Sequence, residues 1–125
     1  MTDQELQELR EWAAGVMGWM VGRDFVFTQG IGSSKHILFG INKIWTPDLD
    51  LNQTFMLVER MKELGWDLYI SILQKGFGLP YWPVDFVADF QKSLHGLSKP
   101  PSSFERCDKS LALAILLAAR ATGVE

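Results

Sequence analysis

The sequence predicts an α+β domain in which three helices cover a largely antiparallel four-stranded sheet, in the order α-β-β-α-β-β-α. Two segments carry apolar residues at the three- and four-residue spacing of amphipathic helices. Two pairs of segments are rich in strand-forming residues and are joined by short loops, as antiparallel strands are. The last segment, 111–125, is a nearly all-apolar helix that stops at Gly123, and it must therefore be covered by the rest of the domain. At 125 residues we expect a single domain over 1–125.

The first half of the chain contains a helix, two strands and a second helix. Thr2 and Glu5 have the spacing of a capping box, and Gly18 and Gly22 mark the end of the helix. The apolar stripe behind this cap consists of Leu6, Leu9, Ala13, Val16 and Met20. Segments 24–29 and 36–45 predict a β-hairpin around the loop 30–35. The second helical stripe, which ends at Gly65, consists of Leu51, Phe55, Val58 and Met61.

The second half contains two further strands and the apolar helix. Residues 66–72 alternate in the way expected of a strand with one buried face, and residues 84–90 alternate similarly. The segment 98–103 is predicted to be a loop leading into the final helix, with Ser102 or Ser103 as its cap.

Composition excludes several classes of function. The formal net charge of −3 argues against general nucleic-acid binding, which needs a basic surface. The single cysteine, Cys107, excludes an intrachain disulfide and a thiolate zinc cluster and fits a reducing compartment. The first residues do not have the pattern of a signal peptide, and the apolar run 111–119 is about half of the roughly 20 residues that span a bilayer, so we expect no membrane association.

Short motifs spread over most of the chain resemble the phage and prophage ABA-sandwich family of small proteins. Relatives often carry a cysteine in the final motif, where this chain has Leu116, and the segment 30–35 is longer than expected. The matching motifs are 16–19 (VMGW), 45–48 (WTPD), 58–61 (VERM), 113–119 (LAILLAA) and 123–125 (GVE). The resemblance implies a viral accessory protein that acts in the host cytoplasm, and it supplies no catalytic motif. Small phage proteins of this kind are often counter-defence factors, which is an argument from analogy.

Two loops are candidate ligand sites. In the first, glycines allow close approach of a ligand and consecutive N–H groups form an anion nest, while the serines and the lysine suit a phosphate. Its residues are Gly30, Gly32, Ser33, Ser34, Lys35 and His36; the alternative is an ordinary hairpin tip. In the second loop, Phe77, Tyr81 and Trp82 are of the type that stacks on a purine, and the alternative is a turn packed on the sheet. Were both loops at one end of the sheet, they would form a composite pocket.

The remaining polar residues predict no catalytic residue, metal site or cofactor. His36 and His95 have no partners at ligand spacing, and Asp85 and Asp89 are interpreted as solvated residues on the outer face of a strand. Cys107 is placed near the start of the last helix, without a neighbouring histidine. Asp48 and Asp50 lack the rest of a calcium loop and are interpreted as helix caps.

These observations lead to three functional hypotheses. The first is a non-enzymatic protein that sequesters a small nucleotide-derived signal, such as a cyclic nucleotide or a cyclic ADP-ribose. The second is an inhibitor that binds a host defence protein through exposed aromatic and acidic residues. The third is an enzyme that degrades the signal, using His36, His95 or Asp85. The five tryptophans also favour self-association into a homo-oligomer.

Overall fold

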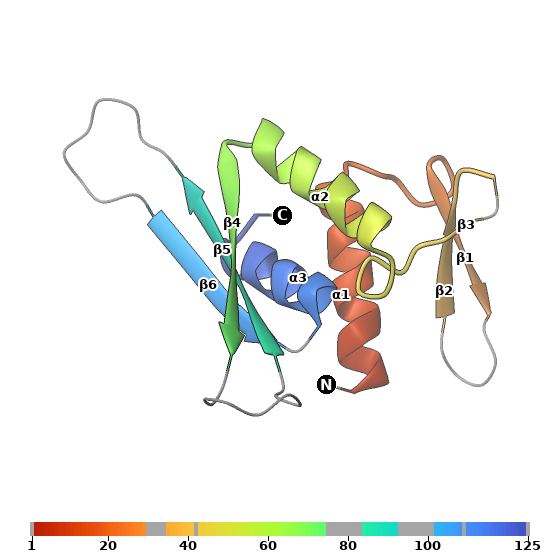
Figure 1. The fold of residues 1–125 in the computed structure, drawn as a ribbon. Coiled ribbons are helices and arrows are strands. Elements are labelled where there is room, and N and C mark those ends of the chain that lie inside the picture. The colour runs from red at the N-terminus through yellow and green to blue at the C-terminus, as the bar shows by residue number, and fades with distance from the viewer. Residues whose placement is uncertain are drawn as a thin grey trace.

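The computed structural model of the chain has three layers, with the helices between two β-sheets (Figure 1). It describes residues 2–29, 35–41, 43–74, 84–92, 102–108 and 110–124, and at some strand ends it describes the backbone alone. The elements are α1 (Asp3–Val16), β1 (Phe25–Gln29), β2 (Lys35–Phe39), β3 (Lys43–Ile44), α2 (Leu51–Glu63), β4 (Trp66–Gln74), β5 (Val84–Lys92), β6 (Ser102–Asp108) and α3 (Leu111–Ala121). Sheet A is β1-β2-β3 and sheet B is β4-β5-β6, and both are antiparallel meanders.

The α+β class is confirmed, but the prediction of one four-stranded sheet and the order α-β-β-α-β-β-α are wrong. The predicted strand 36–45 is divided at Gly40, whose φ of +57° turns the chain between β2 and β3. The chain from Ser102 to Asp108 is predicted to be the end of a loop and the start of the last helix, and this prediction is wrong. The segment forms β6 and pairs with β5 along its whole length. Each half of the chain is therefore a helix followed by its own three-stranded sheet.

Local signals place the helix ends well at two of the three helices. Thr2 Oγ1 accepts a hydrogen bond from the Glu5 amide at 3.2 Å, and α1 ends at Val16, just before the left-handed Gly18. Met20, predicted on the apolar stripe of this helix, therefore lies outside it and is exposed. Asp50 caps α2 by accepting from the Asn52 amide at 2.9 Å. The predicted cap of the last helix is wrong, because Ser110 caps α3 through the Leu113 amide at 3.3 Å.

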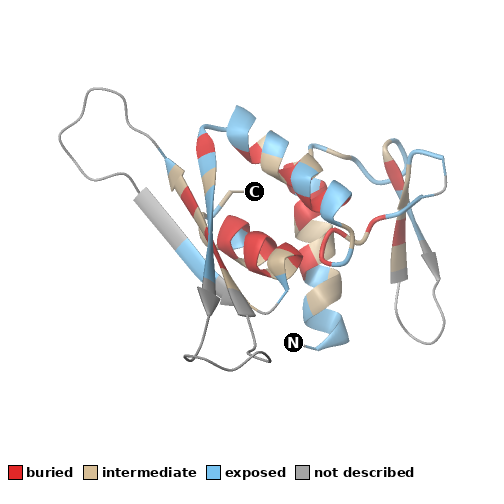
Figure 2. Ribbon diagram, in the orientation of Figure 1, coloured by how far each residue is buried: buried red, intermediate tan, exposed pale blue. Residues whose placement is uncertain are grey.

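The apolar helix α3 lies at the centre of the molecule, as its composition predicts (Figure 2). Its buried residues occur on several sides, and α3 contacts β5, β6, α1 and α2. They are Ala112, Ala114, Ile115, Leu116, Ala118 and Ala119. On the sheet B side α3 covers Ala88 and Phe90, which are fully buried. Small alanine side chains let this helix approach the sheet and the other helices closely.

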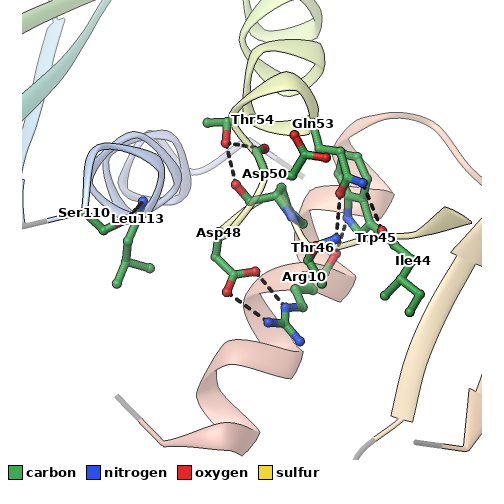
Figure 3. Close-up of polar contacts among 11 residues, drawn as sticks. Arg10, Ile44, Trp45, Thr46, Asp48, Asp50, Gln53, Thr54, Ser110 and Leu113 are labelled. Carbon is green, nitrogen blue, oxygen red and sulfur yellow. Dashed lines mark hydrogen bonds and ion pairs between the residues drawn. The ribbon is translucent and has the colours of Figure 1, made fainter.

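Aromatic and polar contacts hold sheet A and the loop before α2 against the helices. The ring centroids of Trp19, Phe39 and Trp45 lie 4.8–5.3 Å apart, and Trp45 Nε1 donates to the carbonyl oxygen of Arg10 at 3.0 Å. The Arg10 guanidinium donates two hydrogen bonds to the Asp48 carboxylate, at 2.7 and 2.9 Å (Figure 3). Asp48 is therefore an ion-pair partner, and its prediction as a helix cap is wrong.

Candidate functional site

Most residues of the two predicted ligand loops lie outside the described part of the chain. These are Gly30, Gly32, Ser33 and Ser34 of the first loop, and Phe77, Tyr81 and Trp82 of the second. The strands that flank them are described: β1 and β2 belong to sheet A, and β4 and β5 belong to sheet B on the other side of the helices (Figure 1). The composite pocket requires both loops to lie at one end of a single sheet. That premise is wrong, because the two hairpins belong to different sheets.

Two residues of the first loop lie in β2. Lys35 is described by its backbone, which pairs with Gln29. His36 pairs with Thr28, and its side chain is partly buried. The His36 Nδ1 atom is buried and has no hydrogen-bond partner in the described structure. A buried ring nitrogen of this kind normally has a partner, so it is a feature that a ligand or a water molecule would satisfy.

The residues considered for catalysis are not brought together. His36 lies in sheet A, Asp85 lies in sheet B, and His95 is outside the described residues. Cys107 lies in β6 opposite Val87, so the prediction that it lies near the start of the last helix is wrong. Within the described residues, no group of three or more His, Cys, Asp or Glu side chains is placed to hold a metal ion.

The outer face of sheet B carries a row of polar side chains that no sequence motif singles out as a site; its two outer members are exposed and the central one is half-buried. Tyr69 of β4, Asp89 of β5 and Glu105 of β6 are direct cross-strand neighbours, so their side chains lie on one face. Asp67 lies two residues from Tyr69 on that face, and Gln91 donates a hydrogen bond to Asp89 at 2.7 Å. Because neighbouring strands are about 4.8 Å apart, the row of three spans about 10 Å.

The helices pack on the opposite face of this sheet. Figure 1 shows α2 and α3 on one side of β4, β5 and β6, and buried Ala88 and Phe90 point to that side. Tyr69 is 54% exposed, and Asp67 and Glu105 are also exposed. Among the described side chains of the outer face, three are carboxylates and none is a cation. This face is defined here as the acidic face: Asp67, Tyr69, Ser71, Val87, Asp89, Gln91 and Glu105.

The acidic face contains a pair of like charges on neighbouring strands. Asp89 and Glu105 are directly opposite each other on β5 and β6. Like charges in this position destabilise a sheet by up to about 1 kcal/mol. Asp89 also has other interactions, among them the hydrogen bond from Gln91, which act against this repulsion.

A groove runs beside the free edge of sheet B, between α2 and β4. It has a volume of about 510 Å³ and is open to solvent. One wall is a stripe of α2, formed by Phe55, Val58 and Lys62, and the other is the segment 66–70 of β4. This lining combines apolar side chains with one lysine and one aspartate, without a cluster of phosphate-binding groups.

Comparison of the chain with protein-family models, with curated proteins and with solved structures finds no match. The resemblance to the phage ABA-sandwich family therefore stays a prediction. None of the described helices has the length and apolar character that crossing a membrane requires.

Proposed function

We propose that the protein is a phage accessory protein that inhibits a host defence protein by binding a basic surface of it through the acidic face. The row Tyr69–Asp89–Glu105, with Tyr69 and Glu105 exposed and Asp89 half-buried, lies on a sheet face that carries no described cation, and it is the observation that supports this proposal. The phage context and the host target come from the sequence resemblance and are part of the proposal.

The chemistry of the acidic face suits such a partner. Arginine and lysine pair with carboxylates, and electrostatic complementarity of this kind accelerates encounter and selects the partner. Tyrosine is enriched among the residues that dominate binding energy, and Tyr69 is more than half exposed at the edge of the row. The paired strands hold the backbone that carries these side chains in place, so less backbone conformational entropy is lost on binding than with a loop.

The test uses two matched triple variants. The first, Asp67→Asn, Asp89→Asn and Glu105→Gln, neutralises the acidic face. The control, Glu8→Gln, Glu11→Gln and Glu59→Gln, removes the same charge from α1 and α2, where none of these carboxylates forms an ion pair in the described structure. Wild-type protein immobilised as bait is expected to retain one bacterial protein, and the acidic-face variant is expected to lose it. Equal retention by the two variants would contradict the proposal.

A second candidate is sequestration of a small nucleotide signal, and the unpartnered His36 Nδ1 supports it. This nitrogen lies in β2, directly after the predicted phosphate loop, where it would contact a ligand bound there. Calorimetric titration with cyclic nucleotides and cyclic ADP-ribose isomers tests this function. Binding that is lost in both Ser33→Ala and His36→Ala, with the acidic-face variant unaffected, would favour it over protein binding. The absence of a heat signal with every compound of the panel would exclude this second function.

A further inference from the structure

The free edge of β4 lacks the features that usually protect an edge strand. β4 pairs continuously with β5 over nine residues, and among the described elements only β5 and α2 contact it. Its sequence, WDLYISILQ, contains no proline and no lysine, and Asp67 is its one charged residue. Natural proteins commonly block such edges with prolines, lysines or bulges, because unpaired N–H and C=O groups otherwise recruit another strand.

Apolar side chains next to this edge are exposed. Ile70 and Ile72 share the helix-facing side of β4 with Leu68, yet they are 43% and 62% exposed. Phe55 of α2, across the groove, is 42% exposed. The groove is lined by five consecutive residues of β4, which point to alternate faces, so it follows the edge of the strand.

Symmetry restricts how β4 can pair with itself. A twofold axis perpendicular to the sheet keeps each side chain on its own face. Residues that face each other must therefore be an even number of positions apart, so the pairing is centred on one residue that faces its own copy. The register centred on Ile70 pairs all nine residues of β4, and any other centre pairs fewer. In this register Ile70 faces its own copy, Leu68 faces Ile72 and Tyr69 faces Ser71.

The charges of the strand fit this register. Asp67 faces the uncharged Leu73 of the second copy. The two Asp67 residues are six positions apart along the strand, which corresponds to about 20 Å at about 3.4 Å per residue. That separation exceeds the Debye length of about 8 Å at physiological salt, so their repulsion is screened. On the helix side, Ile72 of the second copy would lie beside Leu68, at the groove.

We propose that two copies of this chain pair antiparallel along β4, centred on Ile70, and form one six-stranded sheet in the order β6-β5-β4-β4-β5-β6. The pairing would satisfy the free backbone groups and cover Ile70 and Ile72. It would also join the two acidic faces, with both Tyr69 residues next to the axis. The use of this joined face rests on the proposed function, whereas the pairing itself does not.

Light scattering measures the pairing directly. The wild-type protein is expected to have twice the 14.2 kDa mass of one chain. Ile70→Lys places two like charges opposite each other at the axis, and Ile72→Lys places a charge against the apolar Leu68 of the second copy. Each is expected to weaken the dimer by about 100-fold or more in Kd. Ile44→Lys is the matched control, because Ile44 is 46% exposed on sheet A. A wild-type mass of one chain at millimolar concentration, or a dimer insensitive to both β4 lysines, would overturn the proposal.

Cross-linking tests the register even where a lysine variant fails to fold. In a Cys107→Ser background, Ile70→Cys is expected to give a covalent dimer with a short bis-maleimide, whereas Glu105→Cys on the other edge strand is not. Preferential linkage through Glu105→Cys would overturn the proposal. The two proposals fail separately. A wild-type protein that is monomeric and still retains a host protein supports the acidic face alone, and a wild-type dimer that retains none supports the pairing alone.

Discussion

Sheet A and sheet B are both three-stranded antiparallel meanders that follow a helix, but their outer faces differ in chemistry. In sheet A the row across the three strands is Val26–Leu38–Ile44, and Val26 and Ile44 are about half exposed. In sheet B the corresponding row is Tyr69–Asp89–Glu105. One order of elements thus supports an apolar outer surface in one half of the chain and an acidic one in the other.

The difference extends to how each sheet is held. Sheet A has strands of five, five and two residues and is fixed by the aromatic contacts of Phe39 with Trp19 and Trp45. Sheet B has strands of nine, nine and seven residues and packs its helix side on α3. The comparison indicates that stability depends on the helix-facing side of each sheet, while the outer face of sheet B is available for binding.

The largest effect is expected from Trp45→Ala, which removes the ring that joins sheet A to α1. Trp45 is 1% exposed and also loses its hydrogen bond to the Arg10 carbonyl. We expect a loss of about 4 kcal/mol in the free energy of unfolding, measured by urea denaturation. A loss below about 1 kcal/mol would show that sheet A does not depend on this contact.

The next largest effect is expected from Asp48→Ala. The substitution leaves the largely buried Arg10 guanidinium without its carboxylate, and Arg10 is 18% exposed. Breaking a buried pair costs about 3 kcal/mol. The double variant Arg10→Met, Asp48→Ala is expected to recover part of this loss, because no unpaired charge remains. A double variant that is less stable than Asp48→Ala would contradict this explanation.

The smallest effect, and one of opposite sign, is expected from Glu105→Gln. Removing one charge of the Asp89–Glu105 pair is expected to raise the free energy of unfolding by about 0.5 kcal/mol. The matched change, Glu59→Gln on α2, is expected to alter stability by less than about 0.5 kcal/mol in either direction. Destabilisation by Glu105→Gln would mean that the carboxylate serves the fold, and would weaken the functional argument for the acidic face.

The sequence predicts those elements of the fold whose signals lie within a few neighbouring residues, and it fails where distant residues decide the structure. The cap residues Thr2 and Asp50 and the glycine stop at Gly65 identify α1 and α2 because a helix end is formed within a few residues. The strand β6 was missed because Ser102 and Ser103, after two prolines, have the composition of a loop and cap. Pairing with β5 overrides that local preference.

The candidate site was predictable only in part. The alternation of Asp67 and Tyr69 with apolar neighbours predicts a polar face on β4, but no local signal shows that Glu105 joins it. Strand partners depend on tertiary packing, so a single sequence gives the faces of a strand and leaves its neighbours open. For the same reason, the division into two sheets at Gly40 and the separation of the two hairpins could not be predicted.

The most direct test of the central claim, that this protein acts through the outer face of sheet B, is the affinity of the two triple variants for the captured host protein. We expect neutralisation of Asp67, Asp89 and Glu105 to raise Kd by about 100-fold, with the wild-type affinity falling as salt is added. The helix control, in which Glu8, Glu11 and Glu59 are neutralised, is expected to bind like wild type. Equal affinity of the two variants would contradict the account.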